Sequence, residues 1–409
     1  MKIWIKYIAG VLIGLAFAFV APAQNPSFTS LMEFLSGLVI QFGRYALYPV
    51  LFFGFTVGVY ELREGKTLFR LGLVTAIVII ITSLIAVVTG LSTVLIRNPS
   101  RIPIFVEGAS EIGRIGIGES LRQLFPSSAF EAFTNGLFIL PLCIFGGFAG
   151  AGCAVDKSAS KAAITLFDSL ARVSYAVMCF FVDVVSIGMI ALSTHWTLQF
   201  MNMLSSKVFI DFMLLLGFNF LLLALVVYPA LLRALCGKIN PYRVLYGCVA
   251  SSVAAFFSGD SNMTLPILLR HANESLGVKR RVSSVTLPMF SIFGRPGTAL
   301  TVTVSFIVIL KSYSSLGIDF SDMLWLMGIS VALSFFLGRF PSGGAYIALA
   351  TVCALYGRGF EAGYLILKPA AFFICSVACA IDALTAQMGT FAIAKKWDVV
   401  NHRDLRFFI

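Results

Sequence analysis

Long apolar stretches separated by short polar segments make up the first 235 residues of the chain. The pattern predicts six membrane-spanning helices, at 4–22, 33–60, 70–96, 131–155, 164–193 and 208–233. Each has roughly the 20 residues that an apolar α-helix needs to cross the hydrocarbon core of a bilayer. Because the apolar runs are continuous and do not alternate with polar residues, the strands of a membrane β-barrel are not expected. The pattern therefore indicates a polytopic all-α membrane protein.

The pattern changes after Asn240, where two apolar segments are each broken by a short polar stretch. The segment 241–276 is interrupted at 258–262 and has basic loops at both ends, so it is expected to enter and leave the membrane on one face. The segment 321–358 is interrupted at 338–344, and its ends are expected on the opposite face. We interpret both segments as re-entrant helical hairpins with polar tips.

Each predicted hairpin is followed by one apolar span, at 283–310 and at 362–396. These spans also carry polar residues, at 294–298 and at 382–387, where we expect the helices to break. A hairpin followed by a broken helix, repeated with inverted topology, is typical of secondary transporters. Irregular backbone at membrane depth is tolerated only where it is buried in protein or lines a cavity. The four interruptions are therefore expected to converge on one substrate site.

Composition and charge support this class and suggest an orientation. The content of 59% hydrophobic and 12% charged residues excludes a soluble domain, in which about 25% of residues are usually charged. The net charge of +11 does not indicate a nucleic-acid partner, because most Lys and Arg residues lie in short loops that the positive-inside rule assigns to one face. We expect a multi-pass protein of the cytoplasmic (inner) membrane with both termini cytoplasmic. The run ending at 19–23 also resembles a signal peptide, but a retained first helix is favoured.

The residues that usually carry catalysis or bind metals are sparse. The eight cysteines and three histidines form no pair with metal-ligand spacing, and no nucleophile–base pair is evident near the expected site. We expect the cysteines to pack against apolar neighbours, and we expect neither an enzyme nor a bound cofactor.

Short motifs near the expected interruptions resemble one family of transporters. They are Ser261–Pro266, Thr286–Pro288, Gly297–Leu300, Pro341–Ala345 and Gly389–Thr390. With these motifs at this spacing, the chain resembles the glutamate/aspartate transporter family, the dicarboxylate/amino acid:cation symporters, over nearly its whole length. The resemblance implies eight transmembrane helices plus two re-entrant hairpins, in inverted repeats, as in an elevator-type transporter that forms a homotrimer. It also implies an acidic amino acid or a dicarboxylate as substrate, held between the hairpin tips.

The resemblance further implies a fixed scaffold and a moving transport domain. The scaffold would comprise mainly residues 1–70 and 131–235, with an extracellular loop at 98–130. The third span, 71–97, would lie on the transport-domain side. The transport domain would be residues 240–409, made of hairpin 241–276, span 283–310, hairpin 321–358 and span 362–396.

The chain departs from the family's pattern at several ligand positions. The family's Asn-Met-Asp-Gly-Thr motif reads Gly294-Arg295-Pro296-Gly297-Thr298, so two sodium-ligand positions hold Gly294 and Pro296. In the last span, Cys375 stands where the family has the Asp that binds the substrate amine, and Ala378 stands where it has the Arg that binds the side-chain carboxylate. The Thr that follows that Arg is Cys379 here. Asp382 replaces the sodium-binding Asn, and Ala386 replaces the last sodium-binding Asp. The third span keeps the family's Thr-Ser pair as Thr82 and Ser83, but has Ile79 in place of its Tyr. Sodium needs several oxygen ligands, so sodium coupling is in doubt, and the coupling cation is left open between Na⁺ and H⁺.

Two arginines stand where the sequence predicts apolar surroundings. An arginine at the bilayer centre costs at least about 2.5–3.5 kcal/mol, so its presence is a hypothesis of function. We interpret Arg295 as a bidentate donor to a substrate carboxylate, in place of the missing family arginine. Alternatively, Arg295 pairs internally with Asp382 or Asp260. Arg339, in the second hairpin tip, faces either the substrate or water.

Two carboxylates are expected in the same region. Asp260, in the first hairpin tip, either caps the helix that follows it or carries a proton. Asp382 replaces an amide in the last span, where an unpaired anion would be costly. We therefore regard Asp382 as the better candidate for a titrating group.

The sequence as a whole predicts a secondary active transporter that carries a small anionic solute in symport with a cation, with membrane lipids around it. The alternatives are an uncoupled facilitator or an anion channel on the same fold. The candidate substrate-binding residues are Asp260, Ser261, Asn262, Arg295, Thr298, Arg339, Pro341, Ser342, Gly343, Cys379 and Asp382. The candidate coupling-ion residues are Thr82, Ser83 and Asp382.

Overall fold

The computed structural model describes residues 2–20, 26–97, 99–103, 117–134, 137–205, 207–237, 239–313 and 319–409. Within these ranges the protein is built from helices, and β-structure is limited to two isolated bridges. Seven helical stretches of the described chain are long and apolar enough to cross a membrane. The expected all-α membrane fold is confirmed.

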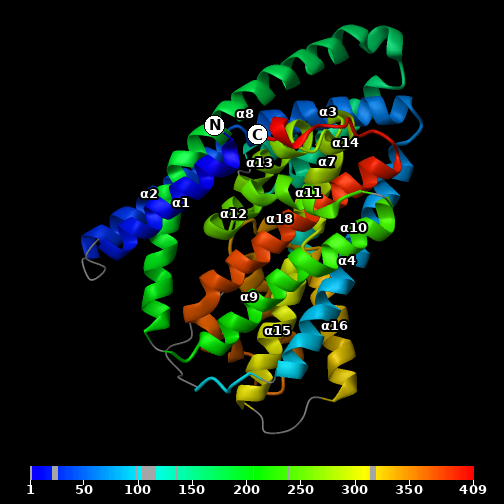
Figure 1. Ribbon diagram of the computed structural model, residues 1–409. Helices are drawn as coiled ribbons and strands as arrows, with labels where there is room; N and C mark the ends of the chain where they lie inside the picture. Colours follow the sequence, from blue (N-terminus) through cyan, green and yellow to red (C-terminus); the bar gives the residue numbers. More distant parts are fainter. Residues whose placement is uncertain are drawn as a thin grey trace.

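The N-terminal half supplies the outer helices. Their bounds are α1 (Ile3–Val20), α2 (Pro26–Tyr45), α3 (Leu47–Glu64), α4 (Leu68–Arg97), α5 (Ile117–Arg122), α6 (Glu131–Thr134), α7 (Leu140–Cys153), α8 (Lys157–Leu204), α9 (Ile210–Leu222), the π-helical turn η1 (Leu223–Val227) and α10 (Tyr228–Cys236). Helix α7 has 14 residues and is therefore only about 21 Å long, shorter than the span expected at 131–155. Helix α8 has 48 residues, extends well beyond 164–193, and bends over one side of the molecule (Figure 1).

Small residues bring α1 into close contact with α8. A methyl group on Gly10 would lie 2.6 Å from the Ser186 carbonyl oxygen, so only glycine allows this approach. Hydrogen bonds join the two helices, from the Tyr7 hydroxyl to the Val182 carbonyl at 2.9 Å and from the Thr194 hydroxyl to the Gly14 carbonyl at 3.0 Å. The segment expected as the first span is thus a packed helix. The cleavage region of the signal-peptide alternative lies outside the described residues.

The C-terminal half contains both expected hairpins. The first consists of α11 (Pro241–Gly247), α12 (Val249–Ser258) and α13 (Ser261–Glu274), and the second of α16 (Phe320–Ser334), the 3₁₀ turn η2 (Leu337–Arg339) and α17 (Gly344–Tyr356). Between them come α14 (Arg280–Phe293) and α15 (Pro296–Tyr313), and after them η3 (Gly363–Ala370), α18 (Ala371–Lys396) and η4 (Leu405–Phe407). Two glycines with positive φ stand at the hairpin breaks, Gly259 at +58° and Gly343 at +72°, a conformation that glycine adopts without strain.

One predicted interruption is wrong. Helix α18 runs through 382–387 without a break, so the described chain has three of the four expected interruptions. This segment contains neither Gly nor Pro, and the polar groups of Asp382 and Thr385 find partners while the helix continues. The Thr385 hydroxyl donates to the Ile381 carbonyl at 2.7 Å, and a neighbouring helix donates to the Asp382 carboxylate. Here the polar residues in an apolar span indicate contacts within the helix and with a neighbouring helix, and not a break in the helix.

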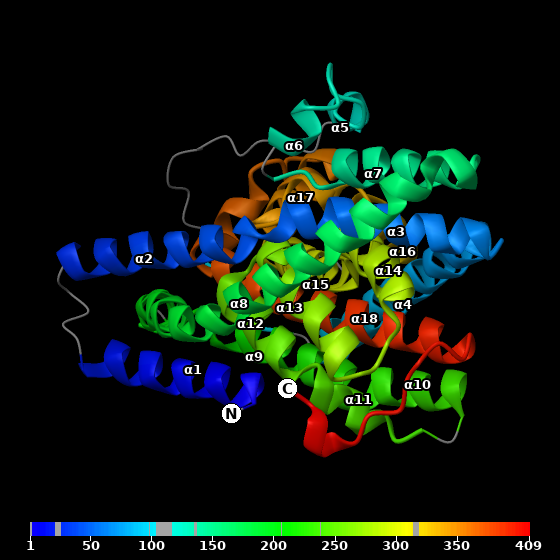
Figure 2. The same ribbon diagram turned by 90° about the horizontal axis from the view of Figure 1, so that it is seen from above.

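The C-terminal spans form the inner layer of the protein. In their most apolar stretches, 94% of the residues of Arg280–Tyr313 and 72% of those of Gly363–Lys396 are buried, against 33% for α1, α4 and α8. Figure 2 shows α14, α15 and α18 near the centre, with α1, α2, α7 and α10 around them. This placement buries the break between α14 and α15, at Arg295 and Pro296.

The two hairpins approach each other tip to tip from opposite ends of the molecule. The backbone of Asp260 pairs with that of Ser342, and the Ser261 N–H donates to the Pro341 carbonyl at 3.0 Å. The open end of the first hairpin lies beside the C-terminal segment, through pairing of Val278 with Val400. Helices α15 and α16 extend to the end of the molecule opposite the two termini (Figure 1).

Candidate functional site

Arg295 lies between α14 and α15, at the break in the span, and is only 3% exposed. Its guanidinium donates from Nε to the Ser291 carbonyl at 3.2 Å, from Nη1 to the Phe340 carbonyl at 3.1 Å and from Nη2 to the Ser261 hydroxyl at 2.8 Å. One arginine thus joins the end of α14 to both hairpin tips.

In this structure Arg295 forms no ion pair with Asp260 or Asp382. Among the described residues, no carboxylate oxygen lies within the 4.0 Å of an ion pair to Arg295. Asp260 is paired with another arginine, and Asp382 accepts hydrogen bonds from α15. Arg295 is therefore a buried cation held by neutral oxygen atoms.

Asp260 is fully buried and serves as the N-cap of α13, accepting from the Met263 N–H at 2.7 Å. This geometry agrees with the helix-cap interpretation of Asp260. Its carboxylate also accepts from Arg44 of α2, from Nε at 3.1 Å and from Nη2. Asp260 is not among the residues that line the cavity next to Arg295. Its side chain therefore fixes the first hairpin tip to α2.

Arg44 was not among the residues expected at the site, although the sequence contains a signal for it. Arg44 stands inside the apolar span predicted at 33–60, and an arginine in such a span calls for a partner by the same reasoning as Arg295. The cost of burial explains the pairing, because an unpaired Asp260 carboxylate would be strongly unfavourable at this depth.

Asp382 of α18 lies against the first turn of α15. Its carboxylate accepts from the Gly297 N–H at 2.7 Å and from the Thr298 hydroxyl at 3.2 Å. The N-terminal N–H groups of a helix lack intrahelical partners, so a carboxylate stabilises them. Gly297 allows the approach, because a methyl group there would lie 2.6 Å from the Ile381 Cβ.

A small cavity of about 20 Å³ connects these groups. It is lined by Ser261, Thr264, Leu268, Phe290, Ser291, Gly294, Arg295, Cys379, Asp382, Ala383 and Ala386. The hydroxyl of Ser291, a residue that the sequence analysis missed, lacks a hydrogen-bond partner within the described chain. The volume holds about one water molecule and is too small for a solute with a carboxylate.

Four other candidate residues belong to the hairpin tips through their backbone or point away. Pro341 accepts from Ser261 through its carbonyl, Ser342 is exposed and pairs with Asp260, and Gly343 precedes α17. The Asn262 amide donates to the Leu137 carbonyl at 2.8 Å, toward the segment before α7.

Arg339 points outward from the second hairpin. Its guanidinium lies 3.3 Å from the Glu119 carboxylate of α5, and its side chain is 30% exposed. This contact reaches the 98–130 loop and not the Arg295 cavity. Of the two arginines that the sequence singles out, the structure brings only Arg295 into the cavity.

The coupling-ion candidates of the third span lie apart from the Arg295 cavity. The Thr82 hydroxyl donates to carbonyls of its own helix, and Thr82 lines a separate cavity of about 340 Å³ with Tyr228 and Thr385. Ser83 is fully buried, and its hydroxyl lacks a partner among the described residues. Of the three candidates, Asp382 alone lines the Arg295 cavity.

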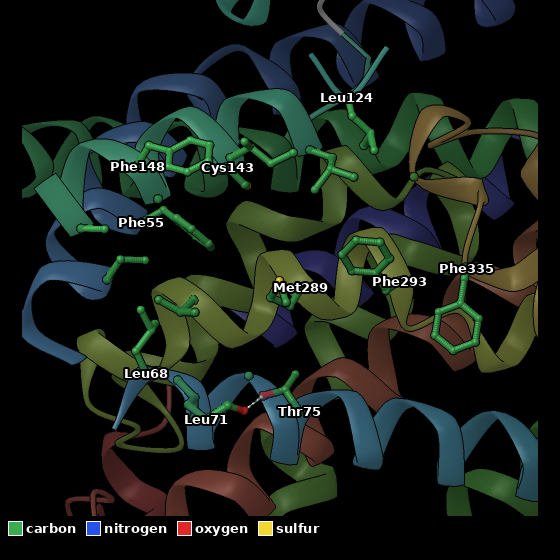
Figure 3. Close-up of a pocket in the computed structure, with 18 of the residues that line it drawn as sticks. Phe55, Leu68, Leu71, Thr75, Leu124, Cys143, Phe148, Met289, Phe293 and Phe335 are labelled. Atoms are coloured by element: carbon green, nitrogen blue, oxygen red, sulfur yellow. Dashed lines mark hydrogen bonds between the residues drawn. The ribbon is translucent and has the colours of Figure 1, made fainter. Parts of the chain in front are cut away.

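A larger cavity of about 770 Å³ lies between the outer helices and the second hairpin (Figure 3). Side chains of α3, α4, α7 and α14 line it, including Met289 and Phe293 of α14, together with Phe335 of the second hairpin (Figure 3). No charged residue contributes to this lining within the described chain. Because an unpaired charge is costly in apolar surroundings, this cavity does not suit a carboxylate.

Comparisons with known proteins agree with this arrangement. The family model described as "Sodium:dicarboxylate symporter family" matches residues 1–396. The serine/threonine transporter of Bifidobacterium adolescentis is 24% identical, over 86% of this chain and 80% of that protein. The proton/sodium-glutamate symport protein of Geobacillus stearothermophilus is 23% identical, over 88% and 87%. The human neutral amino acid transporter B(0) is 22% identical, over 83% and 70%.

Proposed function

Because this chain belongs to the sodium:dicarboxylate symporter family, we propose that it carries a small carboxylate, an acidic amino acid or a dicarboxylate, by elevator-type alternating access. Family membership makes the chain a multi-pass membrane transporter and not an enzyme. The identity of the solute and of the coupling ion belongs to the proposal. The observation that carries the proposal is the geometry of Arg295.

A guanidinium has five N–H groups, and Arg295 uses three of them for Ser291, Phe340 and Ser261. Two N–H groups remain, one on each of the terminal nitrogens Nη1 and Nη2. Such a pair matches the two oxygens of a carboxylate in a bidentate contact. Arg295 and the Ser291 hydroxyl both line the small cavity, so a carboxylate that is admitted there by movement of a hairpin gains three donors.

The charge of Asp382 decides between two kinds of substrate. When Asp382 is protonated, the site carries the net positive charge of Arg295, which favours an anionic solute. When Asp382 is ionised, the two residues offer opposite charges, which favours a zwitterionic amino acid with its ammonium near Asp382. The names of the relatives, which include serine/threonine, neutral amino acid and glutamate carriers, make the second candidate worth testing.

Polar contacts between α13 and the outer helices support an elevator-type movement. Arg270 of α13 lies 3.1 Å from Asp183 of α8, Asp183 lies 3.2 Å from Lys6 of α1, and the Asp183 side chain is 38% exposed. Exchangeable ion pairs suit an interface that slides, whereas interlocked apolar side chains resist sliding. We propose that α1, α2, α3, α7 and α8 belong to the scaffold of a homotrimer in the cytoplasmic membrane, and that the hairpins with α14, α15 and α18 move.

The termini support the proposed orientation. The Lys2 ammonium donates to the Leu405 carbonyl at 2.9 Å, so the two ends of the described chain lie side by side. The basic cluster 279–281 lies beside the C-terminal segment, because the Lys279 N–H donates to the Val399 carbonyl at 3.1 Å, and the clusters 395–396 and 403–406 belong to that segment. Under the positive-inside rule, this face is cytoplasmic.

We further propose that a proton binds to Asp382 and drives transport. The carboxylate is only 7% exposed, and its charge is expensive to move through the membrane unless it is neutralised. Thr82 and Ser83 do not line the Arg295 cavity, which weakens the case for a sodium site built on them. An uncoupled facilitator or anion channel is the competing interpretation.

Uptake by the purified protein in liposomes tests this proposal. Acidic amino acids, dicarboxylates and serine are offered under an imposed sodium gradient, a proton gradient or none. We expect concentrative uptake of a carboxylate under the proton gradient, and loss of that uptake in Arg295→Met. Arg339→Met is the matched control, because that arginine points outward to Glu119. Uptake that never exceeds equilibrium would indicate a facilitator, and unchanged affinity in Arg295→Met would refute the role of Arg295.

A further inference from the structure

The acceptors around Arg295 are the kind of ligands that proteins offer to a metal cation. They are two main-chain carbonyl oxygens and one hydroxyl oxygen. Hard cations such as Na⁺ and Ca²⁺ are held by carbonyl, hydroxyl and carboxylate oxygens. Here a tethered guanidinium takes the three oxygens.

The three oxygens come from three broken elements. Ser291 lies in the last turn of α14, where main-chain carbonyls lack intrahelical partners and the helix end is partially negative. Phe340 lies between η2 and α17 in the second hairpin, and Ser261 begins α13 in the first. A cation at this point therefore compensates a helix end and joins both hairpin tips at once.

We propose that Arg295 is the resident cation of this site, so that the hairpin tips close on each other without binding Na⁺. A guanidinium is charged at every physiological pH and is always present, because it belongs to the chain. A metal ion at the same oxygens would lie beside this fixed charge, where repulsion is strong in the low-dielectric interior. The neighbouring residues Gly294 and Pro296 add no side-chain oxygen that could favour a metal.

This inference rests on the proposed function for the meaning of the cavity, but its test needs no substrate. Cys379 lines the cavity beneath the tips and is 7% exposed, so a thiol reagent reaches it only when the tips separate. Cys353 of α17 is fully buried and does not line this cavity. It therefore reports general unfolding.

The experiment measures the labelling rate of each cysteine by peptide mass spectrometry, in the full-length protein reconstituted in liposomes. Sodium chloride is compared with choline chloride of equal ionic strength. We expect the rate at Cys379 in the wild-type protein to be the same in both salts. We expect Arg295→Met to raise that rate by about tenfold or more, as a loss of about 1.4 kcal/mol in closure does, without change at Cys353. Arg339→Met should behave as wild type.

Each outcome of the labelling experiment either supports or refutes the inference. A wild-type rate at Cys379 that falls in sodium would overturn the inference, as would an unchanged rate in Arg295→Met. If Arg295→Met exposes Cys353 as well, Arg295→Gln replaces it, since Gln keeps amide N–H donors but removes the positive charge. A selective increase at Cys379 in that variant supports the inference, and the wild-type rate refutes it. Failure of the proposed substrate would leave these rates unchanged, so the two proposals fail separately.

Discussion

Replacement of Gly297 by alanine probes the contact on which the Asp382 site depends. A methyl group there would lie 2.6 Å from the Ile381 Cβ and closer still to the Ala378 carbonyl oxygen. Both atoms belong to the rigid part of α18 and cannot rotate away, so α15 and α18 must separate. Overpacking of a tight interface typically costs about 1–3 kcal/mol, and we expect a loss of stability of this size in Gly297→Ala. The separation also lengthens the hydrogen bond from the Gly297 N–H to Asp382, now 2.7 Å.

Two measurements follow the consequences of Gly297→Ala. Unfolding in a denaturing-detergent titration gives the loss of stability, and uptake in liposomes gives the effect on the site. Gly328→Ala is the matched control, because a methyl group on this α16 glycine would meet no atom within 4 Å. Alanine is also the better helix former, by about 1 kcal/mol, so the control should be unchanged or slightly more stable. Equal stability and equal uptake of the two variants would refute the argument.

Three further contacts can be tested by substitution. Arg44→Ala leaves the buried Asp260 carboxylate without its cation and should lower the stability measured in the same titration by about 3–5 kcal/mol. Asp260→Asn keeps a capping side chain and should lower the stability by less. A larger loss in Asp260→Asn than in Arg44→Ala would contradict the pairing. Asp382→Asn keeps an oxygen that accepts from α15 but cannot exchange a proton. We expect uptake by the wild-type protein to be faster with acid on the entry side, and uptake by Asp382→Asn not to respond to pH. A preserved response in the variant would exclude Asp382 as the proton carrier. Gly10→Ala should separate α1 from α8 and lower the stability by about 1–3 kcal/mol. Gly37→Ala is the control and should not change the stability, because its methyl group would meet nothing within 4 Å. Similar unfolding curves for the two variants would argue against the close contact of α1 with α8.

The sequence alone determined the class of the protein and the plan of its C-terminal half. Length of apolar runs is a local property, and a bilayer accepts only segments that satisfy their own backbone, so spans and hairpins could be inferred without three-dimensional information. The breaks at Gly259 and Gly343 were predictable for the same reason, since glycine and proline act on the local backbone. Where polar residues came without them, at 382–387, the prediction of a break was wrong.

The tertiary structure decided the partners of the charged residues. An arginine in an apolar span indicates that some partner exists, but the partner is chosen by packing between segments far apart in the sequence. Arg44 and Asp260 are separated by 216 positions, and only the approach of α2 to the first hairpin brings them together. Arg295 was expected near a carboxylate and instead meets oxygens of both hairpin tips, because the tips converge at the break between α14 and α15. The sequence could identify the charges, whereas their contacts depend on the fold.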